Sequence, residues 1–397
     1  MIKNWNQLTQ NAKIVCLADF FWNIGRTFPH AILTIYLIST GCSLVKIATL
    51  QTVFMITAMI TEFPSGVISD IISRKSVYLC SLISLFISYL LIMINSDSFL
   101  ILVIAYILYG LSVSLKSGTL EAEVVLEYRK LGKDVKEYSV ASTYIMSLSS
   151  IIGGFIGSIL YSNIYGLIYV ISLSLFIISF IIACFCKFEK KNSRISHGSF
   201  LCEIKTGFHI LKSSNVLLYV LCLYALTTLF LQPFFQYWQV LYQNAGINIK
   251  YFGIIYVLFQ VCNIIGAKLY SRMKNIDKTI YMLLIIIPLV FGAGILLENG
   301  AIYTLPLALI VFYIFYQHLD VMAKHFAPEK TMSSYFSLVG TIENISSSIS
   351  LFFMAFCIEH FSIQASYLIL FIGFSVLSLM VFHRTKKSGD VAYEIEI

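Results

Sequence analysis

Hydrophobic residues in this chain form long, nearly uninterrupted runs that are separated by short polar segments. Many of these runs exceed the roughly 18 residues that mark a membrane-spanning helix. A β-barrel would instead alternate polar and apolar residues over short segments, which these runs do not do. Hydropathy windows predict about twelve spanning helices. The predicted spans are 12–38, 44–69, 75–95, 98–121, 138–161, 164–187, 214–242, 250–271, 278–297, 301–324, 333–357 and 362–383.

Composition leads to the same class of protein. Of the 397 residues, 58% are hydrophobic and 12% are charged, and the mean hydropathy is +0.85. A soluble globular protein carries about twice that fraction of charged residues. We therefore predict a polytopic α-helical membrane protein.

The basic residues are distributed unevenly between the two sides of the predicted membrane. Of the 27 Lys and Arg residues, all but four fall on the side that holds both termini. Lys46 and Lys250 lie on the opposite side, at the ends of spans, and Arg26 and Lys116 lie inside spans. Because cytoplasmic loops carry the excess of basic residues, we expect both termini in the cytoplasm. The net charge of +7 therefore reflects membrane topology and does not indicate nucleic-acid binding.

Several sequence signatures are absent. The first apolar run is too long for a cleavable signal peptide and lacks a small-residue cleavage site. The nine cysteines form no C-x-x-C pair or Cys/His cluster, so we expect buried thiols and no metal site. No phosphate-binding Gly-x-x-x-x-Gly-Lys-[Ser/Thr], H-E-x-x-H or G-x-S-x-G sequence occurs. We therefore expect neither an ATPase nor another enzyme, and no cofactor.

The turn between the second and third predicted spans carries one acid and two bases, in the pattern Gly66-x-x-x-Asp70-x-x-x-Arg74-Lys75. We refer to it as the 66–75 motif. Gly66 has no Cβ, so a neighbouring helix can approach closely there. Asp70 can accept hydrogen bonds from Arg74, from Lys75 or from the N-terminus of a facing helix. We predict that these four residues act together as a gate.

The 66–75 motif resembles the loop signature of the major facilitator superfamily. The 62–66 segment (Glu-x-Pro-Ser-Gly) and the 117–122 segment (Ser-Gly-x-x-Glu-Ala) resemble the bacterial drug-exporter-like branch of that family. Ser73 stands where the family usually has Gly, and we expect the turn to tolerate it. The frequent Arg-x-x-x-Gly of the fourth helix is absent, since Tyr106 takes the place of the Arg.

The resemblance implies an all-α membrane protein with twelve transmembrane helices in two six-helix pseudo-symmetric bundles. It also implies alternating access around a central cavity lined by helices 1, 4, 7 and 10. A weaker copy of the 66–75 motif follows the eighth span, with Gly266 and with Tyr270 in place of the acid, as expected of an internal repeat. We place an N-terminal bundle at 1–187, a cytoplasmic linker at 188–213, a C-terminal bundle at 214–385 and a cytoplasmic tail at 386–397.

Polar residues occupy one face of the first predicted helix. Asp19, Asn23, Arg26 and His30 follow one another at steps of four, three and four. Ionisable groups at membrane depth cost at least a few kcal/mol each, so they normally face a watery cavity or a partner. Asp19 is near the cytoplasmic end and could instead reach the interface. Arg26, near the middle of the membrane, is the strongest functional candidate.

Amides form a similar face on the seventh helix, at Gln232, Gln236 and Gln239. They either line water and substrate or form hydrogen bonds between helices. Trp238 beside them suits a flat or cationic ligand. In contrast, we expect Gly153-Gly154-Phe-Ile-Gly157 of the fifth helix to serve helix packing. The predicted substrate-binding residues are Asn23, Arg26, His30, Gln232, Gln236, Gln239, Trp238 and Asn344.

Acidic residues within the predicted spans are candidates for proton coupling, because hydration changes the proton affinity of a carboxylate. The candidates are Asp19, Glu62, Asp320 and Glu343. Glu62 either carries a proton or braces the 66–75 motif. Asp320 can pair with Lys324 one helical turn away.

We predict a secondary active transporter that exports small amphipathic compounds, such as drugs or natural products, by proton-coupled alternating access. We expect it to act as a monomer in a bacterial plasma membrane, in contact with a small-molecule substrate, protons and bilayer lipid, and without nucleic acid. One alternative is a transporter for a specific anionic metabolite, with Arg26 as the ligand clamp. Another is a sensor of the same fold that binds ligand without transporting it.

Overall fold

The computed structural model shows helices and connecting segments, and no strand occurs in the part of the chain that it describes. The described residues are all of 1–397 except the following positions. These are 1, 31–32, 34–36, 38–39, 43, 95–97, 161–164, 189–214, 248–251, 274–285, 287–288, 291–292, 294–300, 330 and 388–397. The all-α class predicted from hydropathy is confirmed.

Close contacts divide the chain into two compact units. The first unit comprises Met1–Gly207 and Ala327–Thr341, and the second comprises Phe208–Phe326 and Ile342–Ile397. The first unit is therefore discontinuous in sequence. The boundaries predicted for the two bundles stay a prediction, and nearly all of the predicted linker at 188–213 lies outside the described residues.

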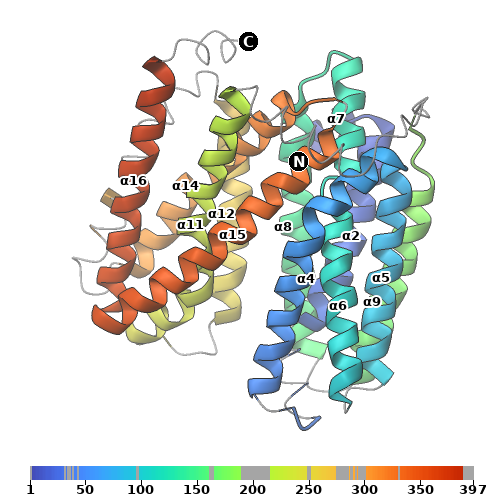
Figure 1. Cartoon of the computed structure of the whole chain (residues 1–397), viewed down its shortest axis with the longest axis horizontal. Helices are drawn as coiled ribbons and strands as arrows, with labels where there is room; N and C mark the ends of the chain where they lie inside the picture. Colours follow the sequence, from blue (N-terminus) through green and yellow to red (C-terminus); the bar gives the residue numbers. More distant parts are fainter. Residues whose placement is uncertain are drawn as a thin grey trace. The chain divides into compact units, whose positions relative to one another are not determined.

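The first unit is a bundle of long helices that run side by side (Figure 1). Helix α2 packs against α8 and α9, and α6 packs against both α4 and α5. Its helices are α1 (Ile2–Gln7), α2 (Gln10–His30), α4 (Leu44–Ile71), α5 (Arg74–Ile94), α6 (Phe99–Lys116), α7 (Leu120–Lys130), α8 (Val135–Leu160), α9 (Tyr165–Cys184) and the first part of α15 (Met332–His360).

Glycines set the closest helix contacts in the first unit. A Cβ added at Gly157 of α8 would collide with the backbone carbonyl of Phe28 on α2, and one at Gly153 would collide with Thr27. A Cβ at Gly110 of α6 would lie 2.7 Å from the carbonyl oxygen of Phe54 on α4. The predicted packing role of the glycine-rich fifth helix is therefore confirmed.

The second unit is built from α11 (Asn215–Asn244), α12 (Phe252–Arg272), α14 (Ala301–Phe326), the remainder of α15 and α16 (Ile363–Lys387). Helix α14 packs against α12 and α11, and α11 also packs against α16. A Cβ at Gly266 of α12 would lie 2.7 Å from the Cβ of Tyr313 on α14. The glycine of the weaker motif copy thus permits close packing, as Gly66 was predicted to do in the first half.

The observed helices follow the predicted spans closely. A helix with described bounds overlaps every predicted span except 278–297, and most of that span lies outside the described residues. Within the described part of the chain, eight helices are long and apolar enough to cross a membrane. The prediction of one continuous fourth helix to residue 121 is wrong. Helix α6 ends at Lys116, because Gly118 adopts a left-handed conformation (φ +63°), and α7 begins at Leu120.

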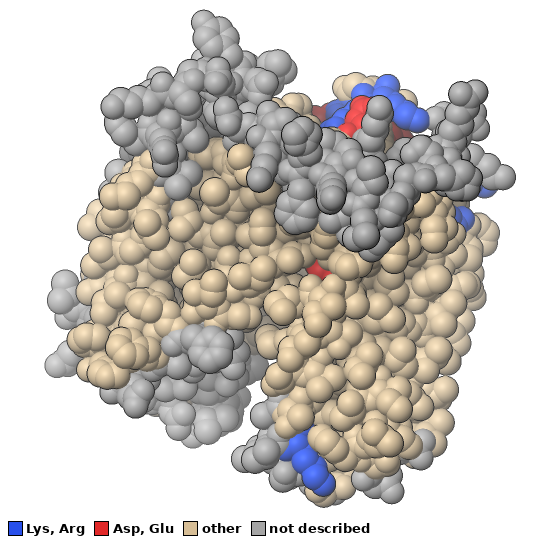
Figure 2. All heavy atoms as spheres, in the orientation of Figure 1, with Lys and Arg blue, Asp and Glu red and all other residues tan. Residues whose placement is uncertain are grey.

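The surface of the first unit suits lipid. Large apolar side chains are exposed on its helices, among them Ile60, Ile72 and Leu100, which are 62–71% exposed. On the face drawn in Figure 2, the described charged side chains of this unit gather mainly near α7, at one end of the bundle. Apolar residues exposed in this way would be unfavourable in water and are expected in a bilayer.

Candidate functional site

Two features of the first unit combine charge with burial: the 66–75 motif and a polar cavity around Asp19. The motif spans the end of α4 and the start of α5. Arg74 is 2% exposed, and its Nη2 and Nε donate to Asp70 Oδ1 at 2.6 and 3.1 Å. Its Nη1 also lies 3.4 Å from Glu123 Oε1 on α7. A buried guanidinium requires such charged acceptors, because burying it unpaired is costly.

Asp70 also binds the start of α15. Its carboxylate accepts hydrogen bonds from the backbone N–H groups of Ser333 (3.3 Å) and Ser334 (2.8 Å) and from the Ser334 hydroxyl (2.8 Å). The first N–H groups of a helix have no acceptor within the helix, and this end of the helix dipole favours an anion. Two of the predicted partner types for Asp70, Arg74 and a helix N-terminus, are confirmed.

Lys75 has different partners from those predicted. Its Nζ donates to the carbonyl oxygens of Cys184 (2.7 Å) and Cys186 (2.9 Å), at the end of α9. A cation is favourable at a helix C-terminus, where carbonyl groups are left without helical donors. Ser73, in the position of the usual glycine, accepts a hydrogen bond on its Oγ from the Ser76 N–H (3.4 Å) and so caps α5.

Helix α4 and the start of α15 fit together at two glycines. A Cβ at Gly66 would collide with the Ser337 side chain and lie 2.8 Å from the Ser333 carbonyl oxygen. A Cβ at Gly340 would lie 2.7 Å from Oε1 of Glu62, which is 4% exposed. The close approach predicted at Gly66 is confirmed, and Glu62 lies against the backbone of α15.

A polar cavity of about 210 Å³ lies within the first unit. We call it the Asp19 cavity. Inside it, Lys116 Nζ lies 3.0 Å from Asp19 Oδ1, and the Tyr78 hydroxyl donates to the same carboxylate at 3.0 Å. The cavity is lined by Asp19, Tyr78, Lys116, Ser117, Gly118, Leu120, Glu121, Tyr138, Ser142 and Met146.

The Trp22 ring of α2 lies close to two cations, Arg26 on the same helix and Lys116 on α6. The centroid of its ring is 4.8 Å from Lys116 Nζ and 5.2 Å from Arg26 Cζ. Arg26 Nη2 also donates to Asn23 Oδ1 at 3.4 Å. Both contacts with Trp22 are within the range of cation–π attraction.

The residues of the predicted polar face of the first helix do not all face the same site. Asn23 is 1% exposed and donates to the Ser149 and Ser150 hydroxyls of α8 at 2.7 and 2.8 Å. It therefore ties α2 to α8, whereas Asp19 lines the cavity. The side chain of His30 lies outside the described residues.

The second unit holds its own buried polar groups. Glu343 Oε1 accepts from the Tyr316 hydroxyl (3.2 Å) and lies 3.4 Å from Thr228 Oγ1, so that α11, α14 and α15 meet at this carboxylate. Lys324 Nζ pairs with Asp320 Oδ2 at 2.6 Å along α14, as predicted. The Lys324 side chain is 4% exposed and that of Asp320 is 26% exposed, so the lysine is buried and the carboxylate is partly open to solvent.

The amide face of the seventh helix is only partly described. Gln232 is half-buried, and the side chains of Gln236 and Gln239 lie outside the described residues. Trp238 is 6% exposed and packs edge-on against Phe259, with ring centroids 5.1 Å apart. Asn344 is half-buried.

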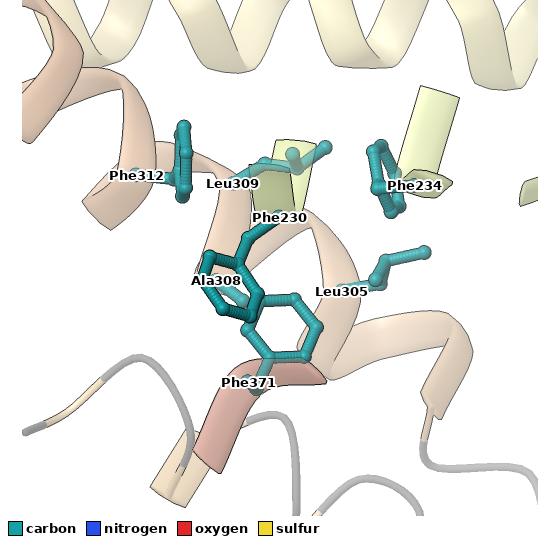
Figure 3. Close-up of a pocket in the computed structure, with 7 residues that line it drawn as sticks. All are labelled: Phe230, Phe234, Leu305, Ala308, Leu309, Phe312 and Phe371. Carbon is teal, nitrogen blue, oxygen red and sulfur yellow. The ribbon is translucent and has the colours of Figure 1, made fainter. Parts of the chain in front are cut away.

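An apolar void in the second unit is too small to hold an organic ligand. Its volume is about 10 Å³, close to the volume needed for one water molecule. Figure 3 shows its side chains converging from α11, α14 and α16, and all of them are hydrocarbon. We interpret it as a packing defect. The lining residues are Phe230, Phe234, Leu305, Ala308, Leu309, Phe312 and Phe371.

Sequence reasoning did not include Lys116, Tyr78 or Tyr138 among the site residues. Lys116 carried a usable signal, because a lysine within a predicted span needs an acidic partner or water. The two tyrosines carried none, because each is one of 25 tyrosines in an apolar chain.

Comparisons with known proteins agree on the fold. A family profile described as the Major Facilitator Superfamily matches residues 15–317. The comparison with curated protein sequences found no match. The chain is similar to the structure of the E. coli fucose:proton symporter, with 14% identity, a TM-score of 0.76 and coverage of 94% of this chain and 98% of the other.

Two other solved structures resemble the chain to a similar degree. The human organic anion transporter matches with 15% identity and a TM-score of 0.73, over 94% of this chain and 98% of the other. A bacterial homologue of the iron transporter ferroportin, in an outward-facing state, matches with 15% identity and a TM-score of 0.70, over 96% of this chain and 100% of the other. At these identities the similarities show a shared fold.

Proposed function

Because the chain belongs to the Major Facilitator Superfamily, we propose that it is a secondary active exporter of small amphipathic compounds, driven by inward proton flow. Membership in this family points to a multi-pass membrane transporter for small molecules rather than to an enzyme. Export, proton coupling and the drug-exporter branch are the proposed part. The matched structures include a fucose:proton symporter and an organic anion transporter, so the fold alone selects neither direction nor substrate.

The ion pair between Asp19 and Lys116 in the Asp19 cavity is the observation that carries this proposal. The cavity is large enough for water, and its carboxylate has an adjustable positive partner 3.0 Å away. An acid inside the membrane normally faces water or a charged partner, and Asp19 has both. Asp19 therefore heads the proton-coupling candidates, with Glu62, Asp320 and Glu343 as the others.

The 66–75 motif is proposed as the gate of the transport cycle. Asp70 binds Arg74 and the start of α15 together, and these contacts hold α4 and α15 at close distance through Gly66. In alternating access, such contacts form in one state and break in another. Lys75 supports the same region by holding the end of α9.

The remaining expectations are proposals as well. We propose a bacterial plasma-membrane protein with both termini in the cytoplasm, acting as a monomer with two bundles at 1–187 and 214–385. The proposed substrate contacts at Asn23, Arg26, His30, Gln232, Gln236, Gln239, Trp238 and Asn344 belong to the same hypothesis.

Counterflow in proteoliposomes tests the proposed function. The purified protein would be given a panel of lipophilic cations, antibiotics, peptides and sugars, with a pH dye inside the vesicles. We expect counterflow of an amphipathic compound and proton movement opposite to it. Intact proton-dependent transport in all four variants Asp19→Asn, Glu62→Gln, Asp320→Asn and Glu343→Gln would contradict proton coupling through these acids.

A second candidate function is transport of a specific anionic metabolite. The guanidinium of Arg26 lies over the Trp22 ring and is held by Asn23, which presents a fixed cation on a membrane helix. Transport of a carboxylate that is lost in Arg26→Ala and kept in the four acid variants would favour this candidate over proton-coupled export.

A further inference from the structure

The ammonium group of Lys116 occupies a set of contacts suited to any ammonium ion. Its Nζ lies 3.0 Å from Asp19 Oδ1 and 4.8 Å from the centroid of the Trp22 ring. A carboxylate supplies a charged hydrogen-bond acceptor, and an indole face attracts a cation. Asp19 and Trp22 both belong to α2, whereas Lys116 reaches them from α6. The two groups that bind the ammonium are thus on one helix, and the ammonium itself comes from another.

The rest of the Asp19 cavity also favours a cation. Its lining includes a second carboxylate, Glu121, and two tyrosines, Tyr78 and Tyr138. Among the lining residues, the carboxylates of Asp19 and Glu121 outnumber the one lysine, Lys116, so the lining itself carries more negative than positive charge. The volume of about 210 Å³ is well above the roughly 10–15 Å³ that a single water needs.

We propose that the Asp19 cavity binds a small organic ammonium ion, and that Lys116 is a built-in competitor that occupies Asp19 and Trp22 until the ligand displaces it. This inference rests on the proposed function, because it names the substrate class of an exporter. Two cations at one carboxylate repel each other, so ligand entry requires Lys116 to leave. Its flexible four-carbon stem allows this movement, and Glu121 offers the displaced ammonium a carboxylate in the same cavity.

Removal of the competitor should strengthen binding. In Lys116→Gln, the ligand no longer has to displace a tethered cation, and we expect its Kd to fall at least tenfold. In Asp19→Asn, the charged acceptor is lost, and we expect binding to weaken at least tenfold. Lys46→Gln is the matched control, because Lys46 Nζ also lies over an aromatic ring, Phe99, at 5.7 Å, and its side chain is exposed and outside the cavity.

The measurement is calorimetric titration of the full-length protein in detergent with benzylammonium chloride. Benzyl alcohol, which has a similar shape and no charge, is the ligand control. We expect benzylammonium to bind at least tenfold more tightly than benzyl alcohol to the wild type, and Lys46→Gln to match the wild type. Unchanged or weaker benzylammonium binding in Lys116→Gln, or equal binding of the two ligands, would overturn the proposal.

Two further variants keep the binding test interpretable if Lys116→Gln does not fold. Lys116→Arg keeps a tethered cation, so its affinity for benzylammonium should stay within about threefold of the wild type. If Lys116→Gln does not fold, Lys116→Met is used, since it keeps the length of the side chain without its charge. Arg and Met variants with the same affinity would contradict a competing role for the lysine charge.

This experiment separates the inference from the proposed function. Titration in detergent has no proton gradient and measures binding alone, whereas vesicle counterflow measures export. Loss of export with tight benzylammonium binding in Lys116→Gln would remove only the export proposal. Export of an amphipathic compound with unchanged benzylammonium binding in Lys116→Gln would remove only the inference about Lys116.

Discussion

Asp70 joins three helices through the two oxygens of one carboxylate. It lies on α4, accepts from Arg74 at the start of α5 and accepts from Ser334 at the start of α15. The first partner follows from the sequence, because Arg74 is only four residues from Asp70 across a short turn. The second partner was predicted only as the N-terminus of a facing helix, since the sequence does not reveal which helix comes close to Asp70.

Neutralising Asp70 should destabilise the protein strongly. In Asp70→Asn, Arg74 stays buried without its main carboxylate, which costs about 3–5 kcal/mol. We expect a clear fall in the thermal unfolding temperature of the purified protein. The control is Asp134→Asn, because Asp134 is exposed and accepts from the Lys136 N–H at 2.8 Å. Asparagine keeps an Oδ1 acceptor for this N–H group and caps a helix about as well as aspartate, so this change should cost less than about 1 kcal/mol. Equal losses in both variants would contradict the buried role of Asp70.

A methyl group at Gly66 should also be unfavourable. In Gly66→Ala, the new Cβ collides with Ser337, and overpacking of this kind costs about 1–3 kcal/mol. Gly373 on α16 is the matched control, because a Cβ there would meet Phe230 at an ordinary 3.7 Å. We expect thermal unfolding at a lower temperature in Gly66→Ala and at an unchanged or higher temperature in Gly373→Ala. The reverse order would show that α15 does not lie against Gly66.

At the scale of elements, the length of the apolar runs predicted most helices. The left-handed backbone of Gly118 explains why the fourth helix ends before the predicted position. Hydropathy averages over many residues, so it passed over the break between α6 and α7 at Gly118. Averaged hydropathy also does not identify which charged side chains form ion pairs with each other. Lys116 and Asp19 lie on helices far apart in sequence, and only the packing of the bundle brings them together.

The break at Gly118 should be sensitive to a side chain for two reasons. Its φ of +63° costs a non-glycine residue about 1–2 kcal/mol, and a Cβ would lie 2.7 Å from the Cβ of Phe336. Gly132 has nearly the same φ of +61° and nothing within 4 Å of its Cβ position. We expect Gly118→Ala to lower the unfolding temperature more than Gly132→Ala. Equal shifts would mean that backbone strain acts alone and that the contact with Phe336 has no cost.

At the scale of the whole molecule, the sequence predicted the membrane class and the spans, but not the composition of the compact units. Residues Ala327–Thr341 belong to the first unit although they follow α14 of the second. The cause is the set of contacts that Asp70, Gly66 and Glu62 make with the start of α15. These contacts depend on tertiary packing, which periodicity along one helix does not encode.

This discontinuity predicts how a divided chain should behave. If the chain is cut within the predicted linker at 188–213, the N-terminal fragment lacks the start of α15, and Asp70 loses the Ser333 and Ser334 donors. We therefore expect the purified N-terminal fragment to unfold at a lower temperature than the same fragment co-purified with its C-terminal partner. Co-expressed fragments should restore vesicle transport that neither fragment supports alone. Equal unfolding temperatures with and without the partner would show that the first unit is complete without residues Ala327–Thr341. A co-purified pair carrying Asp70→Asn is the control, because it should lose most of the stabilisation that the partner provides.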